Sequence, residues 1–254
     1  MVESNKMMEK LRNGQVSIGS MIRCGSPLVA EVFGYSGFDF LFIEGEHWPM
    51  NKETIEGIIR ACDLTGMTSL VRIPNHDTGS VLQFLDIGAS GIIVPHVDTK
   101  EQAEALMKAS KYPPEGERGF SLSCRAAKYG SVPAKEYQQL ANRNTVLIPM
   151  IETKEGVNNL EGILDTGVEA IICGMSDLSA SFGYGGEQDH KDLQEAIQYT
   201  LDTAIKRNVP IGCAVETIED ARKRIEQGFT HIHFSSDLAM IRARSLDVLS
   251  QLKA

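Results

Sequence analysis

Residues 68–97 read TSLVRIPNHDTGSVLQFLDIGASGIIVPHV, with two short apolar runs on either side of a segment with helical spacing. The runs, 68–74 and 91–97, have the length of buried β-strands, and segment 78–88 between them repeats apolar residues every three or four positions. Gly88 ends that segment, as glycine commonly does at a helix C-terminus. This stretch therefore predicts two parallel strands joined by a helix.

The same alternation continues in both directions along the chain. The other strand-like runs are 16–22, 38–45, 145–152, 170–175, 210–215 and 231–236. The other segments with helical spacing include 52–64, 100–110, 154–164, 192–205 and 219–228, and the residues placed to end helices are Gly167, Asn208 and Gly228. Eight strand–helix units predict an α/β protein, a single-domain (β/α)8 TIM barrel over residues 1–254. An open doubly wound sheet is the alternative, but no GxGxxG motif follows the first strand.

Composition excludes several classes of protein. The chain has 25 Lys and Arg against 34 Asp and Glu, a formal net charge of −9, and 42% hydrophobic residues. This apolar content argues against disorder, and an acidic chain without a basic run argues against nucleic-acid binding. No apolar stretch is long enough for a membrane span, and the N-terminal segment lacks the continuous apolar region of a signal peptide. We therefore expect a cytoplasmic protein without a membrane partner.

The pattern of the five cysteines indicates neither disulfide bonds nor metal binding. Their number is odd and no CxxC pair occurs, which argues against a disulfide framework and a cysteine-based zinc site. A reducing compartment fits this pattern.

In a barrel of this kind, catalytic and binding groups lie at the C-terminal ends of the strands and in the loops that follow. Polar side chains at several predicted ends favour one shared site on that rim. They are Arg23, Glu44, Glu46, His47, Arg72, Glu152, Ser176 and Asp177. The long connection over 112–144 is a further candidate for a functional loop, because such lengths are uncommon in compact domains.

Glu152 and Asp177 follow neighbouring strands, so their carboxylates are expected to lie close together. Two close carboxylates repel unless one is protonated or a cation lies between them. Two carboxylates completed by water and substrate oxygens suit Mg²⁺ or Mn²⁺, with Co²⁺ as an alternative. The other interpretation is structural: a glutamate near a helix N-terminus and a capping aspartate in the segment SDLS.

Arg72 interrupts an apolar run, so we expect it to point into the barrel mouth and to pair with a carboxylate or an enolate. Asp86 lies near the C-terminus of an apolar helix, where the helix dipole disfavours a negative charge, so a compensating partner is expected. His47 is the candidate, because a carboxylate on one imidazole nitrogen raises the basicity of the other. The remaining histidines share no ligand spacing and are expected to be loop or strand residues: His76, His96, His190, His231 and His233.

These residues stand in motifs that resemble the HpcH/HpaI aldolase family, the metal-dependent pyruvate aldolases. The similarity covers roughly residues 8–250. It is carried by GFDFLFIEGEHWPMN (37–51), LVRIPN (70–75), FLDIGASGIIVPHV (84–97), YPPEGERGFSLSCRA (112–126), MIET (150–153) and GMSDLS (174–179). Several motifs in the family's order make this match far more specific than any one motif alone.

The resemblance implies a class II aldolase that splits or forms the bond between pyruvate enolate and an aldehyde. The substrate would be a 2-keto-3-deoxy or 4-hydroxy-2-oxo acid. The resemblance makes His47 the general base, Asp86 the residue that makes this histidine more basic, and Arg72 the stabiliser of the transition state. Glu44 and Glu46 would support them.

The resemblance also implies a divalent metal, Mg²⁺ or Mn²⁺, bound by Glu152 and Asp177. The pyruvate carboxylate would lie at the backbone of Ser176 and Asp177. The chain would assemble as a hexamer with its C-terminal helix exchanged between protomers, and the amphipathic segment 237–252 fits an oligomer interface. No lysine stands at a predicted strand end, which disfavours a Schiff-base mechanism.

The chain departs from the family pattern around the substrate. Glu44 replaces the usual aspartate, and Met150, which cannot donate a hydrogen bond, replaces a glutamine that contacts substrate. Trp48 and Cys124 stand where a small residue and, in glucarate-type enzymes, a histidine are common. The metal and base machinery is intact, so these changes indicate an altered preference for the aldehyde.

Two other functions fit the same barrel. One is a citrate lyase β-subunit or malyl-CoA lyase type of carbon–carbon lyase, although no basic cluster indicates a binding surface for coenzyme A. The other is a non-catalytic barrel that binds a small acid, with Met150 marking lost activity. A phosphate-binding isomerase is disfavoured, because the segments AVETIED and FSSDLAM lack a glycine-rich phosphate cradle.

Overall fold

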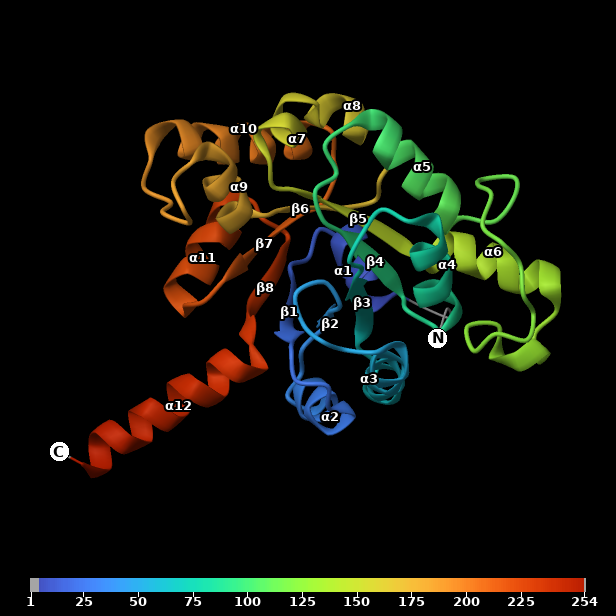
Figure 1. Ribbon diagram of the computed structural model, residues 1–254, viewed down its shortest axis with the longest axis horizontal. Helices are drawn as coiled ribbons and strands as arrows, with labels where there is room; N and C mark the ends of the chain where they lie inside the picture. The colour runs from blue at the N-terminus through green and yellow to red at the C-terminus, as the bar shows by residue number, and fades with distance from the viewer. Residues whose placement is uncertain (1–4, 254) are drawn as a thin grey trace.

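The computed structural model describes residues 5–253, and its eight parallel strands close into a barrel with β1 to β8 in chain order. The predicted (β/α)8 barrel is confirmed (Figure 1). The strands are β1 (Ser17–Ile22), β2 (Phe40–Glu44), β3 (Thr68–Arg72), β4 (Gly91–Val94), β5 (Val146–Ile151), β6 (Ile171–Cys173), β7 (Ile211–Val215) and β8 (His231–Ser236). Each strand lies within one of the eight predicted runs.

Helices surround the barrel and precede or follow its strands. They are α1 (Lys6–Arg12), α2 (Pro27–Tyr35), α3 (Lys52–Thr65), α4 (Thr78–Asp86), α5 (Lys100–Ser110), the 3-10 helix η1 (Lys128–Gly130), α6 (Ala134–Asn144), α7 (Lys154–Asn158), α8 (Leu160–Leu164), α9 (Met175–Phe182), α10 (Lys191–Lys206), α11 (Ile218–Gln227) and α12 (Asp237–Leu252). Helices α1, α2, α6 and α9 are additional to the segments predicted from spacing.

The strands are buried on both faces, which explains their continuous apolar sequences. Every residue of β2, β3 and β5 is buried, because helices cover the outside and side chains fill the inside. Inside the barrel, Phe40, Phe42 and Leu70 pack in one cluster with the buried methionines Met7 and Met8 of α1. Helix α1 thus closes the N-terminal end of the barrel and leaves the C-terminal end for chemistry.

The structure differs from the sequence prediction in two segments, one predicted as a single helix and one as a long loop. The predicted helix 154–164 is two short helices, α7 and α8, which meet at Asn159. The Asn159 side chain donates a hydrogen bond of 2.8 Å to the Asp98 carbonyl, and this bond holds the break between the helices. The long connection 112–144 contains η1 and α6, and α6 supplies Tyr137, which packs on Tyr112.

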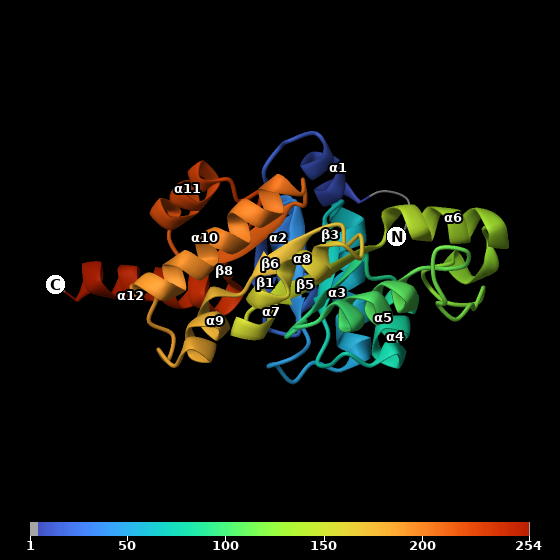
Figure 2. The same ribbon diagram turned by 90° about the horizontal axis from the view of Figure 1, so that it is seen from above.

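Helix α12 projects away from the barrel in both views, on the side opposite α6 (Figures 1 and 2). Asp237 is its buried residue, and its carboxylate accepts the backbone N–H groups of Arg23 and Cys24. The rest of the helix leaves large apolar side chains exposed: Leu238, Ile241, Leu246, Val248, Leu249 and Leu252. Over residues 5–253, no helix has the length and apolar character needed to cross a membrane.

Candidate functional site

The C-terminal ends of the strands surround a cavity of about 370 Å³, here called the barrel pocket. Of the residues predicted for the site, His47, Arg72, Met150, Ser176 and Asp177 line it. The structure therefore places side chains from distant parts of the chain around one cavity, as the barrel rule predicts.

Glu44 organises the turn that follows β2. Its side chain is 1% exposed, and Oε1 accepts the backbone N–H groups of Glu46 at 2.8 Å and His47 at 3.0 Å. Burial alone would raise the pKa of Glu44, but the hydrogen bonds and charge of Arg72, together with these backbone donors, hold it below its usual value. Glu44 therefore stays ionised and fixes the backbone that carries His47.

Arg72 lies opposite Glu44 in the register of β2 and β3. Its Nε donates to Glu44 Oε1 at 3.2 Å and lies 3.2 Å from Glu46 Oε2, while Nη2 donates to Glu44 Oε2. Within residues 5–253, the one hydrogen-bond partner of the other terminal nitrogen, Nη1, is the weakly accepting Met150 sulfur, at 3.9 Å. Two carboxylates thus orient the guanidinium and leave Nη1 directed into the barrel pocket, where an anionic oxygen would be a better acceptor.

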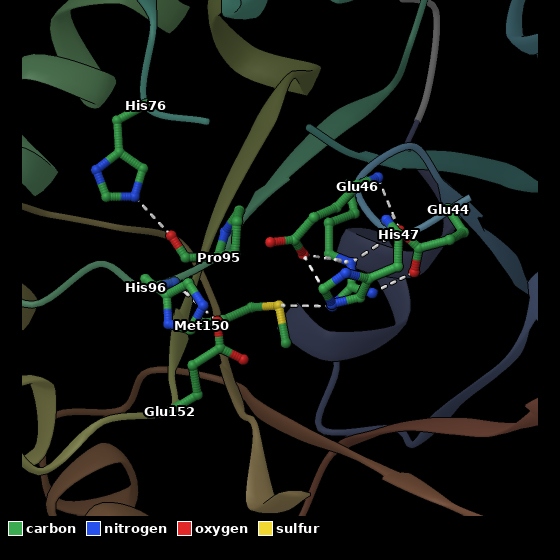
Figure 3. A network of polar contacts seen from close by, with 9 residues as sticks. Glu44, Glu46, His47, His76, Pro95, His96, Met150 and Glu152 are labelled. Carbon is green, nitrogen blue, oxygen red and sulfur yellow. Dashed lines mark hydrogen bonds and ion pairs between the residues drawn. The ribbon is translucent and has the colours of Figure 1, made fainter. Parts of the chain in front are cut away.

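His47 is the accessible base of this group. Its side chain is 63% exposed, and its Nε2 lies 3.7 Å from Glu46 Oε2. Figure 3 shows His47 with Glu44 and Glu46 on one side of Met150, and Glu152 with His96 on the other. The cation–π contact of Arg23 with Trp48, 5.9 Å from the ring centroid, borders the same side.

The single chain does not bring Asp86 and His47 together, so the predicted contact between them is not formed. Arg118 Nη2 donates to Asp86 Oδ1 at 2.7 Å, and Arg118 also lies over the Tyr112 ring. The compensating partner that Asp86 requires at the end of α4 is therefore an arginine of the 112–144 connection. That connection turns back onto α4, where the Ala126 N–H also donates to the Asp86 carbonyl.

Glu152 has one satisfied oxygen and one orphaned oxygen. The side chain is 1% exposed; Oε1 accepts the His96 N–H at 2.8 Å, whereas Oε2 is buried without a hydrogen-bond partner among the described residues. Burial raises the pKa of Glu152 to about 7, and the negative charge of Asp177 adds to the rise. Gly174 makes this arrangement fit, since a Cβ there would lie 2.5 Å from Oε2.

Asp177 lies in the first turn of α9 and does not act as its cap. The N-cap position is Gly174, which has no side chain to accept a hydrogen bond, so the capping interpretation of SDLS is wrong. The first backbone N–H groups of α9, including that of Ser176, have no partner within the helix, which suits an anionic group.

The arrangement of Glu152 and Asp177 suits a divalent cation bound between the two carboxylates, because without one they repel each other. A buried oxygen without a donor, next to a second carboxylate, is a costly arrangement that a hard cation would relieve. Over residues 5–253 no group of three or more His, Cys, Asp or Glu side chains could hold a metal, so water and substrate would have to complete the coordination.

Sequence reasoning missed two groups at this site. His96 follows β4 with a left-handed φ of 50°, and its Nδ1 lies 3.5 Å from Glu152 Oε1. Its position directly after a strand end was the available signal. Glu216 and Ser235 also line the barrel pocket and hydrogen-bond to each other at 2.7 Å.

Two sequence comparisons match most of the chain. The sequence profile described as "HpcH/HpaI aldolase/citrate lyase" matches residues 20–243. A 5-keto-4-deoxy-D-glucarate aldolase of Escherichia coli (strain K12 / DH10B) is 35% identical over 250 residues, covering 98% of this chain and 97% of that protein.

Solved structures show the same architecture. An HpcH/HpaI aldolase/citrate lyase family protein from Burkholderia cenocepacia J2315 superposes with a TM-score of 0.94 at 27% identity, covering 99% of this chain and 100% of that one. The citrate synthase SbnG superposes with a TM-score of 0.89 at 28% identity, covering 98% and 97%.

Proposed function

Because the chain belongs to the HpcH/HpaI aldolase/citrate lyase family and is a carbon–carbon lyase, a class II aldolase, we propose that it cleaves a 2-keto-3-deoxy or 4-hydroxy-2-oxo acid to pyruvate and an aldehyde. Substrates of this class include 2-dehydro-3-deoxyglucarate, 4-hydroxy-2-oxoheptanedioate and the 5-keto-4-deoxy-D-glucarate named for the relative that is 35% identical. The observation that carries the proposal is the orphaned Glu152 Oε2 beside Asp177, in the cavity where Arg72 Nη1 lacks a strong acceptor.

The cation would be held by Glu152 and Asp177. We propose Mg²⁺ or Mn²⁺, with Co²⁺ as an alternative, because carboxylate oxygens suit hard divalent ions. When bound, such an ion would supply Lewis acidity toward the keto oxygen of a 2-oxo acid.

Each of the other residues of the site has a separate role in the cleavage reaction. His47 Nε2 removes the proton of the C4 hydroxyl, the C3–C4 bond breaks, and the aldehyde leaves. Arg72 Nη1 donates to the oxygen on which negative charge develops. The backbone at Ser176 and Asp177 holds the carboxylate, while Met150 gives the aldehyde half an apolar wall. His47 returns its proton to C3, which completes pyruvate.

Assembly would complete the site. We propose a homo-oligomer, a hexamer, in which α12 packs on a neighbouring protomer, because its apolar side chains are exposed in the single chain. The action of Asp86 on His47 would then occur between protomers. We also propose a cytoplasmic location, because all five cysteines are free thiols.

The proposal is tested with purified protein and Mn²⁺. We expect pyruvate release from 5-keto-4-deoxy-D-glucarate and exchange of the pyruvate methyl protons in D₂O. Absence of both reactions would refute the proposal. Pyruvate binding without exchange would identify the non-catalytic acid-binding barrel, and turnover confined to coenzyme A thioesters would identify the citrate lyase type of activity.

Replacing the base separates binding from chemistry. His47→Asn is expected to lower kcat by about 100- to 10,000-fold, the contribution typical of general acid–base catalysis. The Kd for pyruvate should change less than threefold, because His47 acts on the hydroxyl rather than on the carboxylate. His190→Asn, which removes a histidine stacked on Tyr184 outside the barrel pocket, is the control. A His47→Asn enzyme with more than a tenth of wild-type kcat would exclude the assigned role.

The raised pKa of Glu152 predicts that metal binding depends on pH. With a folded-state pKa of about 7 against 4.5 normally, the metal-free folded protein binds more protons than the unfolded chain between these values. Its stability therefore falls as pH rises through that window. A cation must displace the same proton, so the apparent Kd for Mg²⁺ should be about tenfold weaker at pH 6 than at pH 8. Calorimetric titration measures this, and equal affinity at both values would contradict it.

A further inference from the structure

Two histidines of β8 lie inside the barrel and have no part in the proposed reaction. His231 and His233 are two positions apart and therefore point to the same face of the strand. Both are buried, and their rings pack against Phe40, with centroid separations of 6.5 and 4.8 Å. Gly212 on the neighbouring strand makes room for the pair, since a Cβ there would lie 2.0 Å from His231 Nδ1. The space for these rings is thus built into the barrel.

The hydrogen bonds determine which nitrogen of each ring carries the proton. His231 Nε2 lies 3.0 Å from the Ile171 carbonyl oxygen, which can only accept, so Nε2 carries a hydrogen. Burial lowers the pKa of His231 to about 3, so the ring is neutral and Nδ1 is a bare acceptor. That nitrogen lies 3.0 Å from His233 Nε2, which must therefore be the donor.

His233 consequently presents a bare nitrogen to the interior. Burial is the main cause that lowers the pKa of His233, the positive charge of Arg72 lowers it further, and the ring stays neutral. With its proton on Nε2, the other nitrogen, Nδ1, is an acceptor, and it is buried without a donor among the described residues. The two nitrogens of an imidazole point in diverging directions, so Nδ1 points away from His231.

The position of His233 connects this acceptor with the candidate site. The residue is 3% exposed yet forms part of the lining of the barrel pocket. The Phe42 ring contacts both the His233 ring, 5.4 Å between centroids, and the Arg72 guanidinium, 5.3 Å away. Arg72 and His233 therefore both line the barrel pocket, and both contact the same phenylalanine ring.

We propose that His233 Nδ1 accepts a hydrogen bond from an O–H group bound at the floor of the barrel pocket, and that it contributes to the choice of substrate. A neutral nitrogen lone pair selects a hydroxyl group over a carboxylate or a keto oxygen, which are acceptors themselves. A hydroxyl of the 2-oxo acid substrate and an ordered water share this chemistry. The statement that the O–H group belongs to the substrate rests on the proposed function. The statements that an O–H group is bound and that the His233 proton is on Nε2 do not.

Two measurements without turnover test the acceptor itself. In ¹⁵N spectra of the full-length protein, both histidines should be neutral with the proton on Nε2. A crystal structure should place an oxygen about 2.7–3.2 Å from His233 Nδ1, from water in the free protein or from 5-keto-4-deoxy-D-glucarate in its complex. A proton on Nδ1, or the lack of such an oxygen in both structures, would overturn the proposal even if the enzyme is an active aldolase.

Two variants of His233 distinguish the acceptor role of Nδ1 from the hydrogen bond that Nε2 donates to His231. Asparagine can place an oxygen near the position of Nδ1, whereas glutamine can reach the position of Nε2 and keep the bond to His231. His233→Gln should raise the KM for 5-keto-4-deoxy-D-glucarate about 3- to 10-fold, the effect of one neutral hydrogen bond, and leave pyruvate proton exchange within twofold of wild type. His233→Asn should remain within threefold of wild type in both reactions.

Each outcome has a distinct meaning. An active His233→Asn enzyme together with an impaired His233→Gln enzyme would support a hydrogen bond from a substrate hydroxyl to Nδ1. Unchanged kinetics for both variants, with an ordered water on Nδ1 in the wild-type complex, support the water form. An impaired His233→Asn enzyme together with an active His233→Gln enzyme would show that His233 acts through its hydrogen bond to His231, and this result would overturn the proposal. If the enzyme cleaves no 2-oxo acid at all, the proposed function fails while the spectra and the structure still decide about Nδ1.

Discussion

Arg72→Lys is expected to lower kcat for aldol cleavage by about 100- to 1000-fold, the effect of removing one preorganised donor to a developing oxyanion. In the structure, Arg72 Nε and Nη2 contact the carboxylates of Glu44 and Glu46, and Nη1 is directed into the barrel pocket. A lysine ammonium is a single point of charge and cannot bind two carboxylates in fixed geometry while also presenting a planar donor to substrate. Steady-state kinetics with pyruvate release as the readout measure the effect.

Removing the charge altogether tests whether the loss of activity is a loss of folding. Arg72→Met would leave Glu44, 1% exposed, as an unpaired buried charge, which costs about 3–5 kcal/mol. The double variant Arg72→Met with Glu44→Gln removes both charges, so most of the thermal stability should return. Activity should not return, because neither new side chain can donate to the oxyanion as a guanidinium does.

Arg125→Lys is the matched control for this series. Arg125 forms a half-buried ion pair with Asp63 outside the barrel pocket and also donates to the Ile87 carbonyl at 3.0 Å. Its replacement should reduce the melting temperature without lowering kcat more than twofold. If Arg72→Lys retained more than a tenth of wild-type kcat, Arg72 would be a structural partner of Glu44 and not a stabiliser of the transition state.

The sequence predicted the barrel because a parallel strand buried on both faces has a simple signature. The segments FLFIE of β2 and VLIPMI of β5 are apolar almost throughout, and the structure buries every one of their residues. The same logic located Glu44 and Arg72, since a charged residue at the end of such a strand has few places to point other than the mouth. The positions and ends of the strands are local properties, and local sequence patterns predict them well.

Contacts between distant segments could not be predicted in this way. Asp86 pairs with Arg118, 32 residues later, and nothing in either local sequence favours this arginine over His47. The alternation in HIHFSS puts His231 and His233 on one face of β8, but the sequence does not show that His233 Nδ1 lacks a partner, because that depends on the Ile171 carbonyl and on His231. Partner identity is set by how the barrel closes, which is a property of the whole chain.

Glu152→Gln is expected to lower kcat/KM by at least about 1000-fold and at the same time to stabilise the metal-free protein, and these opposite effects make it the sharpest test of the site. Lewis-acid stabilisation is worth several kcal/mol, so losing a ligand of the cation removes most of the rate. In the absence of metal, however, the wild-type carboxylate is buried with Oε2 unpartnered beside the charge of Asp177.

The stability of the metal-free protein distinguishes the loss of a metal ligand from a damaged fold. A neutral amide of nearly the same shape keeps an oxygen for the His96 N–H and avoids burying a charge at pH 8, where the wild-type group is ionised. The melting temperature of Glu152→Gln without metal at pH 8 should therefore exceed that of wild type by a few degrees, and added Mg²⁺ should raise it no further. Asp177→Asn should likewise lose activity and the response to Mg²⁺. Near-normal turnover by Glu152→Gln, or a Mg²⁺ response as large as that of wild type, would remove this pair from the metal site.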